Sequence, residues 1–428
     1  KKGALKGVDT KNLEITDQAL VEVPSEVLQI SSQAVFKFSR NRLTAVPKRL
    51  CGLGKLTILD LSHNQIKKIP SQIALLNQLR ILMLNDNEIS EVPLAITSCT
   101  ALEELHLQRN KIETVPLNLV SLTALVLLDL GSNSLNALSN DTQHWTNLRT
   151  LRINDNKFTE LPNGIDKLPN LEVLEVQGNP ITQLPANIGE LSRLEVLKAG
   201  HCHLSKLPAS VSHMTSLTTL HLNNNKFTEL PDEVYQLTAL RELCFQSNTV
   251  SEVPPHVIKL SQLSYLDLSN NQLQSLPYQL GQMRIATGQT SLRLEGNPFT
   301  ELIPREIMLQ GTPAIISFLR MLNTSKSSWR RVKLVLVGQE EVGKTSLRKA
   351  LLEISGASSG TLRRKKSTQV GAAATQASGD TVATDGIDIE DWTLTGVTGE
   401  AVTATEPMTG ASTTDLTFSC WDFGGQEV

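Results

Sequence analysis

The chain has 428 residues, of which 40% are apolar and 19% are charged, and its formal net charge at pH 7 is −3. This composition excludes a wholly disordered protein, because disordered chains contain too few apolar residues to form a core. The small net charge gives no overall attraction to polyanions, so we expect no nucleic-acid partner and at most a peripheral membrane contact.

The cysteines of the chain are few and scattered. No C-x-x-C pair occurs, no run of eighteen apolar residues is present, and the start "KKGALKGVDT" lacks both an initiator Met and a signal-type apolar stretch. Scattered thiols are typical of a reducing compartment, so we expect a cytoplasmic protein. We also expect the sequence to begin inside a longer polypeptide.

A repeat of 23 residues fills most of the chain. Segments such as "LTILDLSHNQIKKIP" (56–70) and "LTTLHLNNNKFTELP" (217–231) share the template L-x-x-L-x-L-x-x-N-x-[LIF]-x-x-[LIV]-P. The asparagine position recurs from Asn41 to Asn271 and again at Asn297, with Cys202 once in its place. This is the leucine-rich-repeat pattern, in which each coil must stack on its neighbours to bury its leucines. We predict a horseshoe-shaped solenoid of about 12 to 13 coils over residues 1–311.

Individual positions of the template have physical roles. We expect the asparagine side chain to bond backbone groups inside the core, and the proline to begin the return segment on the convex side. Gln18 occupies the asparagine position of the first repeat, which we interpret as a degenerate terminal repeat. Ser139 stands where a proline is expected, and we predict an irregular convex face there. The cluster "HCH" (201–203) resembles a metal site, but Cys202 belongs to the core pattern and no further ligands are indicated.

The variable residue of each L-x-L lies on the concave strand face. These residues alternate in charge, which indicates no phosphate-binding stripe: Lys37, Asp60, Met83, His106, Asp129, Arg152, Glu175, Lys198, His221, Cys244, Asp267 and Arg293. Two residues earlier in each repeat the same face is partly apolar, with Ile58, Ile81, Leu127, Val173 and Val196. This face is either an ordinary strand surface or a docking surface for a protein partner or for another part of the chain.

The solenoid is followed by a helix and a second domain. "GTPAIISFLRML" (311–322) has apolar residues at helical spacing, so residues 312–329 are expected to form a capping helix and a polar linker. Residues 330–428 begin with a strand (332–337) and the loop "GQEEVGKTS", which has the G-x-x-x-x-G-K-[ST] spacing of a phosphate-binding loop. The candidate nucleotide-binding residues here are Gly338, Gly343, Lys344, Thr345 and Ser346.

The chemistry of these residue types points to a Mg²⁺-bound nucleotide. Backbone N–H groups of the loop surround phosphate oxygens, Lys344 reaches the β- and γ-phosphates, and the Thr345 hydroxyl binds Mg²⁺. "LTFSCWDFGGQEV" (416–428) predicts a second strand ending in Asp422, a second Mg²⁺ ligand. Gly425 would contact the γ-phosphate, and Gln426 would orient the attacking water.

The intervening residues contain one further candidate. Thr384, in "ATDGIDIEDW", is the best candidate for a switch threonine that contacts Mg²⁺ and the γ-phosphate. The flanking segments 355–382 and 395–414 are rich in small and polar residues and are expected to be mobile loops. We interpret the basic run 363–366 as part of a solvated loop rather than as a nuclear signal or a lipid-binding patch.

Together these features resemble the Roco family: leucine-rich repeats, a capping helix, then a Ras-of-complex GTPase with "GQEEVGKTS", "TDGIDIEDW" and "WDFGGQE". The resemblance implies an α/β protein, a solenoid followed by part of a P-loop Ras-like domain, that binds GTP or GDP with Mg²⁺ and hydrolyses GTP in signalling. It also implies a dimerising region, and in some such proteins a kinase, beyond Val428.

Two hypotheses remain open. The first is a regulatory GTPase whose repeats bind partners or restrain the switch, and the second is a repeat scaffold with an inactive nucleotide domain. The sequence contains no [NT]-K-x-D element, so guanine specificity follows from the family resemblance alone. We expect this chain by itself to bind guanine nucleotide weakly and to lack useful GTPase activity.

Overall fold

The computed structural model describes residues 12–25, 27–29, 34–282, 291–299, 303–324, 331–336, 362–366, 387–397 and 414–423. Contacts divide the chain into two compact units, Lys1–Asn323 and Thr324–Val428. Each unit is described by itself.

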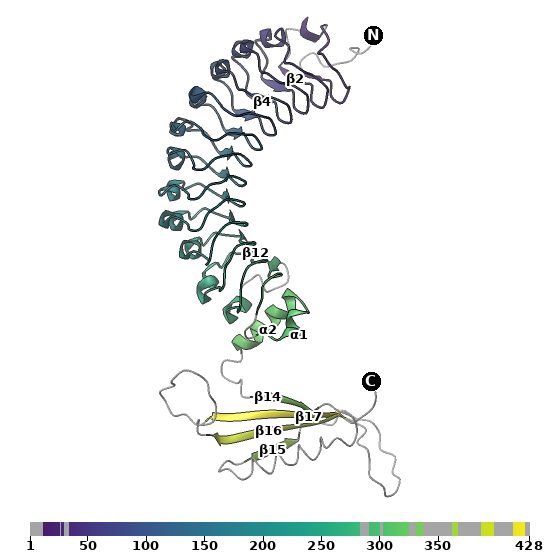
Figure 1. Cartoon of the computed structure of the whole chain (residues 1–428), viewed down its shortest axis with the longest axis vertical. Helices are drawn as coiled ribbons and strands as arrows, with labels where there is room; N and C mark the ends of the chain where they lie inside the picture. The colour runs from purple at the N-terminus through teal and green to yellow at the C-terminus, as the bar shows by residue number, and fades with distance from the viewer. Residues whose placement is uncertain are drawn as a thin grey trace. The chain divides into compact units, whose positions relative to one another are not determined.

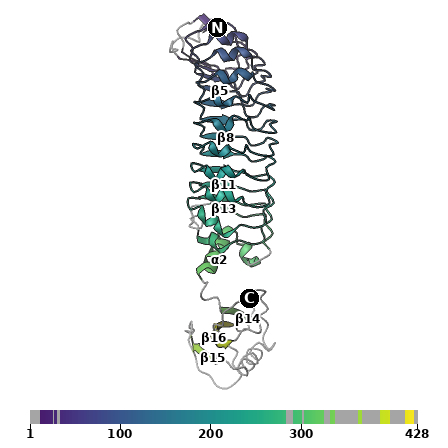
Figure 2. The ribbon, with the colours of Figure 1, turned by 90° about the vertical axis from the view of Figure 1, so that its left-hand side faces the viewer.

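The first unit is a solenoid built on one parallel sheet of thirteen strands in sequence order. The strands line the inner side of an arc and short 3₁₀ helices line its outer side (Figure 1), and the coils stack in one column (Figure 2). Each strand has three residues: β1 (Asn12–Glu14), β2 (Val35–Lys37), β3 (Ile58–Asp60), β4 (Ile81–Met83), β5 (Glu104–His106), β6 (Leu127–Asp129), β7 (Thr150–Arg152), β8 (Val173–Glu175), β9 (Val196–Lys198), β10 (Thr219–His221), β11 (Glu242–Cys244), β12 (Tyr265–Asp267) and β13 (Ser291–Arg293).

The register of this sheet follows the sequence period. Leu59 pairs with Leu82, 23 residues on, and the same offset holds from β1 to β12 before it grows to 26 at Leu266 and Leu292. The middle residue of each strand is buried, because successive strand residues point to opposite faces and one face is turned into the coil. The predicted solenoid is therefore confirmed, and its leucines form one continuous core.

The convex side consists of single 3₁₀ turns, η1 to η12. Where a proline precedes the turn directly, it adopts an extended or near-extended conformation and begins the return segment, as Pro70 does with φ −73° and ψ 148°. The bounds are Val27–Gln29, Leu50–Gly52, Ser71–Leu75, Leu94–Ser98, Leu117–Ser121, Thr142–His144, Ile165–Lys167, Ile188–Glu190, Ala209–His213, Asp232–Gln236, Pro255–Lys259 and Tyr278–Gln282.

The coil that contains Ser139 was expected to be irregular. It keeps a three-residue turn at Thr142–His144, equal in length to the turns of the next two coils, which do contain the proline. Trp145 follows this turn with 1% of its surface exposed, and its indole Nε1–H donates to the Leu119 carbonyl at 3.3 Å. Burial of this ring holds the coil in place, so the expectation of an irregular face is not met at the level of secondary structure.

A ladder of asparagine side chains runs through the core. Asn64 is typical: its amide Nδ2 donates to three carbonyls, those of Phe38, Leu61 and Ser62, at 2.9 to 3.0 Å. Its Oδ1 accepts from the backbone N–H of Leu43 in the preceding coil at 3.0 Å. One side chain thus satisfies buried donors and acceptors in two coils, which explains why the template requires asparagine.

Cys202 fills the same position less completely. Its thiol lies 3.7 Å from the Val176 carbonyl and 3.5 Å from the Gly200 carbonyl, both longer than the amide bonds of the ladder. The N–H of Ile181, whose counterparts elsewhere donate to an asparagine Oδ1, donates to the Asn179 carbonyl at 2.8 Å. Cys202 is therefore a core residue, as the repeat pattern predicts.

Two helices close the C-terminal end of the solenoid: α1 (Arg305–Met308) and α2 (Thr312–Thr324). Ile315, Ile316 and Leu319 of α2 join the core of the repeats with 4%, 5% and 1% exposure. The Arg320 Nε–H donates to the Gly281 carbonyl at 3.0 Å, and a side chain at Gly281 would collide with the α2 backbone. Helix α2 extends two residues beyond the predicted end, and α1 was not predicted.

The second unit contains a sheet of four strands in the order β14-β17-β16-β15. The strands are β14 (Arg331–Leu336), β15 (Leu362–Lys366), β16 (Ile387–Val397) and β17 (Thr414–Phe423). Strand β14 is parallel to β17, whereas β16 is antiparallel to both β17 and β15.

The loop predictions for this unit need correction. The basic run 363–366 lies within β15, and β16 extends through Val397 into the segment predicted to be a loop. The register pairs Lys365 with Asp391 and Lys366 with Glu390, which are residue types of opposite charge. Composition alone misses this, because the complementary residues are separated by more than twenty positions in the sequence.

Candidate functional site

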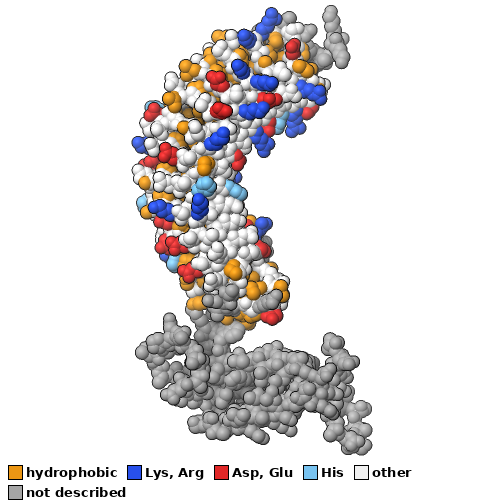
Figure 3. Space-filling view, in the orientation of Figure 1, with side chains coloured by type: hydrophobic (Ala, Val, Ile, Leu, Met, Phe, Trp, Pro, Cys, Tyr) orange, Lys and Arg blue, Asp and Glu red, His pale blue; other side chains and the backbone are white. Residues whose placement is uncertain are grey.

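The concave face of the solenoid presents two rows of side chains, because the first and third residues of each strand point away from the core. The first concave row consists of the first strand residues, from Val35 on β2 to Tyr265 on β12. The second concave row consists of the third residues, from Lys37 to Arg293. On the face in view in Figure 3, acidic and basic side chains are interspersed along the solenoid.

The first concave row is apolar over much of its length. Leu127, Val173 and Val196 lie on β6, β8 and β9 and are half-buried, as are Ile58 and Ile81 on β3 and β4. Only Thr150 on β7 interrupts the row between β6 and β9. The centre of the face therefore offers aliphatic side chains that adjacent coils do not cover completely.

Beside these residues, the second concave row forms a charge ladder of Asp129, Arg152, Glu175 and Lys198. Arg152 lies between two carboxylates, with Nη1 3.6 Å from Asp129 Oδ2 and Nε 3.6 Å from Glu175 Oε1. Lys198 Nζ is 3.0 Å from Glu175 Oε1. The ladder alternates in sign and carries no net charge, so it suits a partner with both acidic and basic groups rather than a polyanion.

The two carboxylates of the charge ladder differ in electrostatics. Burial raises the pKa of Asp129, and the backbone N–H of Gly131 and the charge of Arg152 offset this only in part. Burial also raises the pKa of Glu175, but the hydrogen bond from Lys198 and the charges of Lys198 and Arg152 outweigh it, so the net pKa is lowered. A hollow of about 440 Å³ adjoins Asp129, Arg152 and Glu175.

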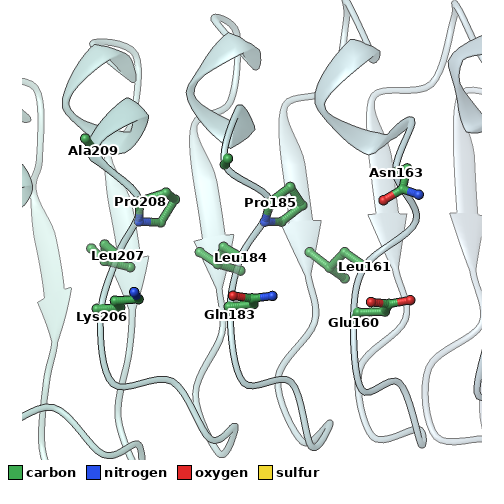
Figure 4. Close-up of a pocket in the computed structure, with 11 residues that line it drawn as sticks. Glu160, Leu161, Asn163, Gln183, Leu184, Pro185, Lys206, Leu207, Pro208 and Ala209 are labelled. Atoms are coloured by element: carbon green, nitrogen blue, oxygen red, sulfur yellow. The ribbon is translucent and has the colours of Figure 1, made fainter.

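Grooves also occur between the proline segments of neighbouring coils. Figure 4 shows one of about 460 Å³, where Leu161, Leu184 and Leu207 of three successive coils lie in one row, with Glu160, Gln183 and Lys206 in the row beside them. A similar groove of about 470 Å³ follows along the solenoid. Because such grooves recur with the coil and bring together no catalytic combination of groups, we attribute them to the repeat geometry.

A group of metal-binding residue types lies farther along the concave face. In the described part of the chain, ligand atoms of His221, Glu242 and Cys244 lie within 4.8 Å of one another. In the sequence, only the "HCH" run suggested a metal site, and there His201 and His203 are exposed and Cys202 is buried. The signal was present in the repeat itself, since His221 and Cys244 occupy the same template position one coil apart.

The predicted nucleotide site falls mainly outside the described residues. Gly338, Gly343, Lys344, Thr345, Ser346, Thr384, Gly425 and Gln426 all lie there. Asp422 lies in β17, one residue from the end of the strand. The described elements adjacent to these positions are the strands β14, β16 and β17.

Two further observations concern the thiols and the helices. The described cysteines, Cys51, Cys99, Cys202 and Cys244, are free thiols. Within the described ranges, every helix is too short or too polar to cross a lipid bilayer.

Comparison with protein families identifies the repeats. Residues 110–224 match the family described as leucine-rich repeat region, and residues 56–112, 216–237 and 262–283 match leucine-rich repeat families. The chain is thus a leucine-rich-repeat protein over these residues. A leucine-rich-repeat protein of Leptospira interrogans has a similar structure, with 28% identity, a TM-score of 0.57 and coverage of 68% of this chain and 85% of that one.

Two further similarities concern larger proteins. The probable serine/threonine-protein kinase roco11 of Dictyostelium discoideum is 36% identical over 127 residues within the repeats. This match covers 29% of the present chain and 7% of the relative, so the chain spans a small part of that protein's length. The crystal structure of PEPR1–AtPEP1 is similar with 25% identity and a TM-score of 0.52, covering 67% of this chain and 48% of that chain.

Proposed function

We propose that the solenoid is a protein-docking module. A segment of a protein partner binds against Leu127, Val173 and the charge ladder. The observation that carries this proposal is the adjacency of a half-buried aliphatic row and a row of alternating charges on one concave face. Burial of the aliphatic row supplies affinity, and the alternating charges select the partner's register. The similarity to the PEPR1–AtPEP1 structure supports this use of the fold.

The docking surface is tested by site-specific crosslinking in cells. A photoreactive residue in place of Val173 should give a discrete protein adduct, and the same residue in place of Leu94, an exposed position on the convex side, should not. Arg152→Glu should abolish the Val173 adduct, because it places three negative side chains next to one another on β6 to β8. Equal adducts from both positions, or an adduct insensitive to Arg152→Glu, would refute docking on this face.

We further infer that residues 330–428 form the first part of a GTP-binding and GTP-hydrolysing domain of the Roco type, acting in cytoplasmic signalling. The strand register supports this inference. Leu336, the last residue of β14, pairs with Asp422 of β17, and Asp388 of β16 pairs with the same residue. The end of β14, the start of β16 and the end of β17 therefore lie side by side at the same end of the sheet.

This arrangement has a chemical consequence. The loop with Lys344 and Thr345 follows β14 directly, Thr384 precedes β16 by three residues, and Gln426 follows β17 by three residues. Segments that join the strands at the same end of a sheet are close in space. The residues that bind phosphate, bind Mg²⁺ and orient water would therefore converge there. The residues present address the phosphates and the metal, whereas no [NT]-K-x-D element for the base occurs among them.

Nucleotide binding is measured by calorimetry with Mg²⁺ and a non-hydrolysable GTP analogue. We expect weak, Mg²⁺-dependent binding with little discrimination against the ATP analogue, and a loss of at least about tenfold in Lys344→Ala. Lys366→Ala, on the edge strand β15, is the matched control and should bind normally. If Lys344→Ala binds as well as the unmodified chain, the phosphate loop does not hold nucleotide and the scaffold alternative is favoured.

A further inference from the structure

His221, Glu242 and Cys244 converge because of the sheet register. His221 on β10 pairs with Cys244 on β11, so their side chains lie in the second concave row one strand apart. Glu242 is two residues before Cys244 and therefore points to the same face from the first concave row. The His221 Nε2 atom is 2.9 Å from Glu242 Oε1, and Cys244 Sγ is 3.8 Å from the same oxygen.

These distances are close to those of a metal site. Tetrahedral Zn²⁺ with bonds of about 2.0 to 2.3 Å places its ligand atoms about 3.3 to 3.7 Å apart. The present separations are 2.9 and 3.8 Å, and all three atoms lie within 4.8 Å of one another. Each ligand atom would move by no more than about 1 Å to reach the zinc geometry, which side-chain torsions alone can supply.

We propose that His221, Glu242 and Cys244 bind a Zn²⁺ ion on the concave face. Imidazole, carboxylate and thiolate are the three protein ligand types that zinc prefers, and the thiolate disfavours the oxygen-seeking Mg²⁺ and Ca²⁺. With the thiol deprotonated, the ligand set carries two negative charges, which neutralise the ion. Binding therefore releases the thiol proton to solvent.

The surrounding charged groups are compatible with this assignment. Lys198, the neighbour of His221 on β9, is directed to Glu175 at 3.0 Å and does not compete for Glu242. Asp267, the neighbour of Cys244 on β12, accepts from the N–H and hydroxyl of Ser269 at 3.0 and 2.6 Å. Neither of these two side chains is needed as a ligand.

The site has three protein ligands and an outward-facing side. The His221 and Glu242 side chains are 23% and 41% exposed, so the ion would be reached from the concave side. A water molecule or a group from a bound molecule would complete the tetrahedron, as in zinc sites that keep one position open. Metal binding here is independent of both proposed functions.

Co²⁺ titration of the reduced chain tests this proposal, since cobalt replaces zinc and reports thiolate ligation through a sulfur-to-metal charge-transfer band. We expect one equivalent of Co²⁺ to produce this band together with tetrahedral d–d absorption, and Zn²⁺ to abolish both. Cys244→Ser should eliminate the charge-transfer band, and His221→Ala should weaken Zn²⁺ binding by more than about tenfold.

The matched control is the double variant His201→Ala/His203→Ala, which removes the other histidines flanking a cysteine and should leave the titration unchanged. Circular dichroism of each variant establishes that the solenoid is intact, and Glu242→Gln, which conserves shape and keeps the thiolate, should weaken Zn²⁺ binding by more than about tenfold even if Cys244→Ser fails to fold. Absence of a thiolate band in the unmodified chain, a band that survives in folded Cys244→Ser, or unchanged Zn²⁺ affinity in Glu242→Gln would overturn the proposal.

Discussion

The interior and the concave exterior of the solenoid repeat with the same period of 23 residues, yet they use it differently. Inside, one bonding pattern recurs from coil to coil, as Asn64, Asn87 and Asn156 show with nearly identical partners. Outside, the equivalent positions of successive coils carry Asp129, Arg152 and then Glu175. The repeated positions thus maintain the fold, while the varied ones are available for binding. Changes inside should therefore cost much more stability than changes outside.

The largest effect is expected for Trp145→Ala. This change removes a fully buried ring in a densely packed coil and leaves the Leu119 carbonyl without its indole donor. We expect a loss of about 3 to 5 kcal/mol in the free energy of unfolding, measured by urea denaturation. Leu117→Ala, at a position 71% exposed, is the control and should change stability by less than about 0.5 kcal/mol. Similar losses for both variants would contradict the greater cost of changes in the core.

Asn179→Ala should have the next largest effect. Asn179 is 1% exposed, accepts from the Phe158 N–H at 3.0 Å and donates to the Ile153 and Val176 carbonyls at 2.9 and 2.8 Å. Its removal leaves buried backbone groups without partners and should cost about 2 to 4 kcal/mol by thermal or urea unfolding. Asn163→Ala, in an exposed turn, provides the comparison, and a cost below about 1 kcal/mol for Asn179→Ala would contradict the role of the ladder.

Cys202→Asn tests the ladder in the opposite direction. The new amide would donate to the Val176 and Gly200 carbonyls, and its oxygen would accept from the Ile181 N–H, as in the other coils. We expect a gain of about 1 kcal/mol in unfolding free energy. Cys202→Ala should instead lose stability, and a destabilised Cys202→Asn protein would show that this coil has adapted its packing to the thiol.

The smallest effect is expected outside, for Asp129→Asn. Burial raises the pKa of Asp129 above its unfolded value, so the folded state disfavours the ionised carboxylate. The free energy of unfolding therefore falls as the pH rises from the usual carboxyl range through the raised pKa, and the loss is complete above it. The variant should therefore be slightly more stable than the unmodified chain at pH 7, and the difference should disappear as the pH falls below the usual carboxyl range. Paired melting curves at several pH values measure this, and a variant that is less stable at pH 7 would show that the Arg152 contact dominates.

The interior of the solenoid was predictable because its period depends on local stacking. The position of Asn64 in the template suffices to place Leu59 in the core and Ile58 on the concave face. For the exterior, the sequence predicted which residues lie on the concave face but not which of their side chains come close to one another. His221 and Cys244 were both assigned to the concave face, but their approach to Glu242 depends on strand register and side-chain direction, which a one-dimensional search for adjacent ligands does not detect.

The four-stranded sheet shows a different limit. Strand β14 and the strand β17 were predicted from apolar runs next to motifs, whereas β15 was not, because its residues are basic and its partner lies far along the chain. The phosphate-loop residues remain predictions, since their assignment depends on spacing rather than on any described contact.

The constant register from β1 to β12 also affects how a repeat protein of this kind evolves. Loss of residues 180–202 by unequal crossing-over would join matching positions, so the core and the asparagine ladder would close again with one coil fewer. On the concave face, however, β8 would then adjoin β10, and Glu175 would face His221 in place of Lys198. Duplication or deletion of a whole coil thus changes which side chains are neighbours on the concave face in one step, while the solenoid fold is kept.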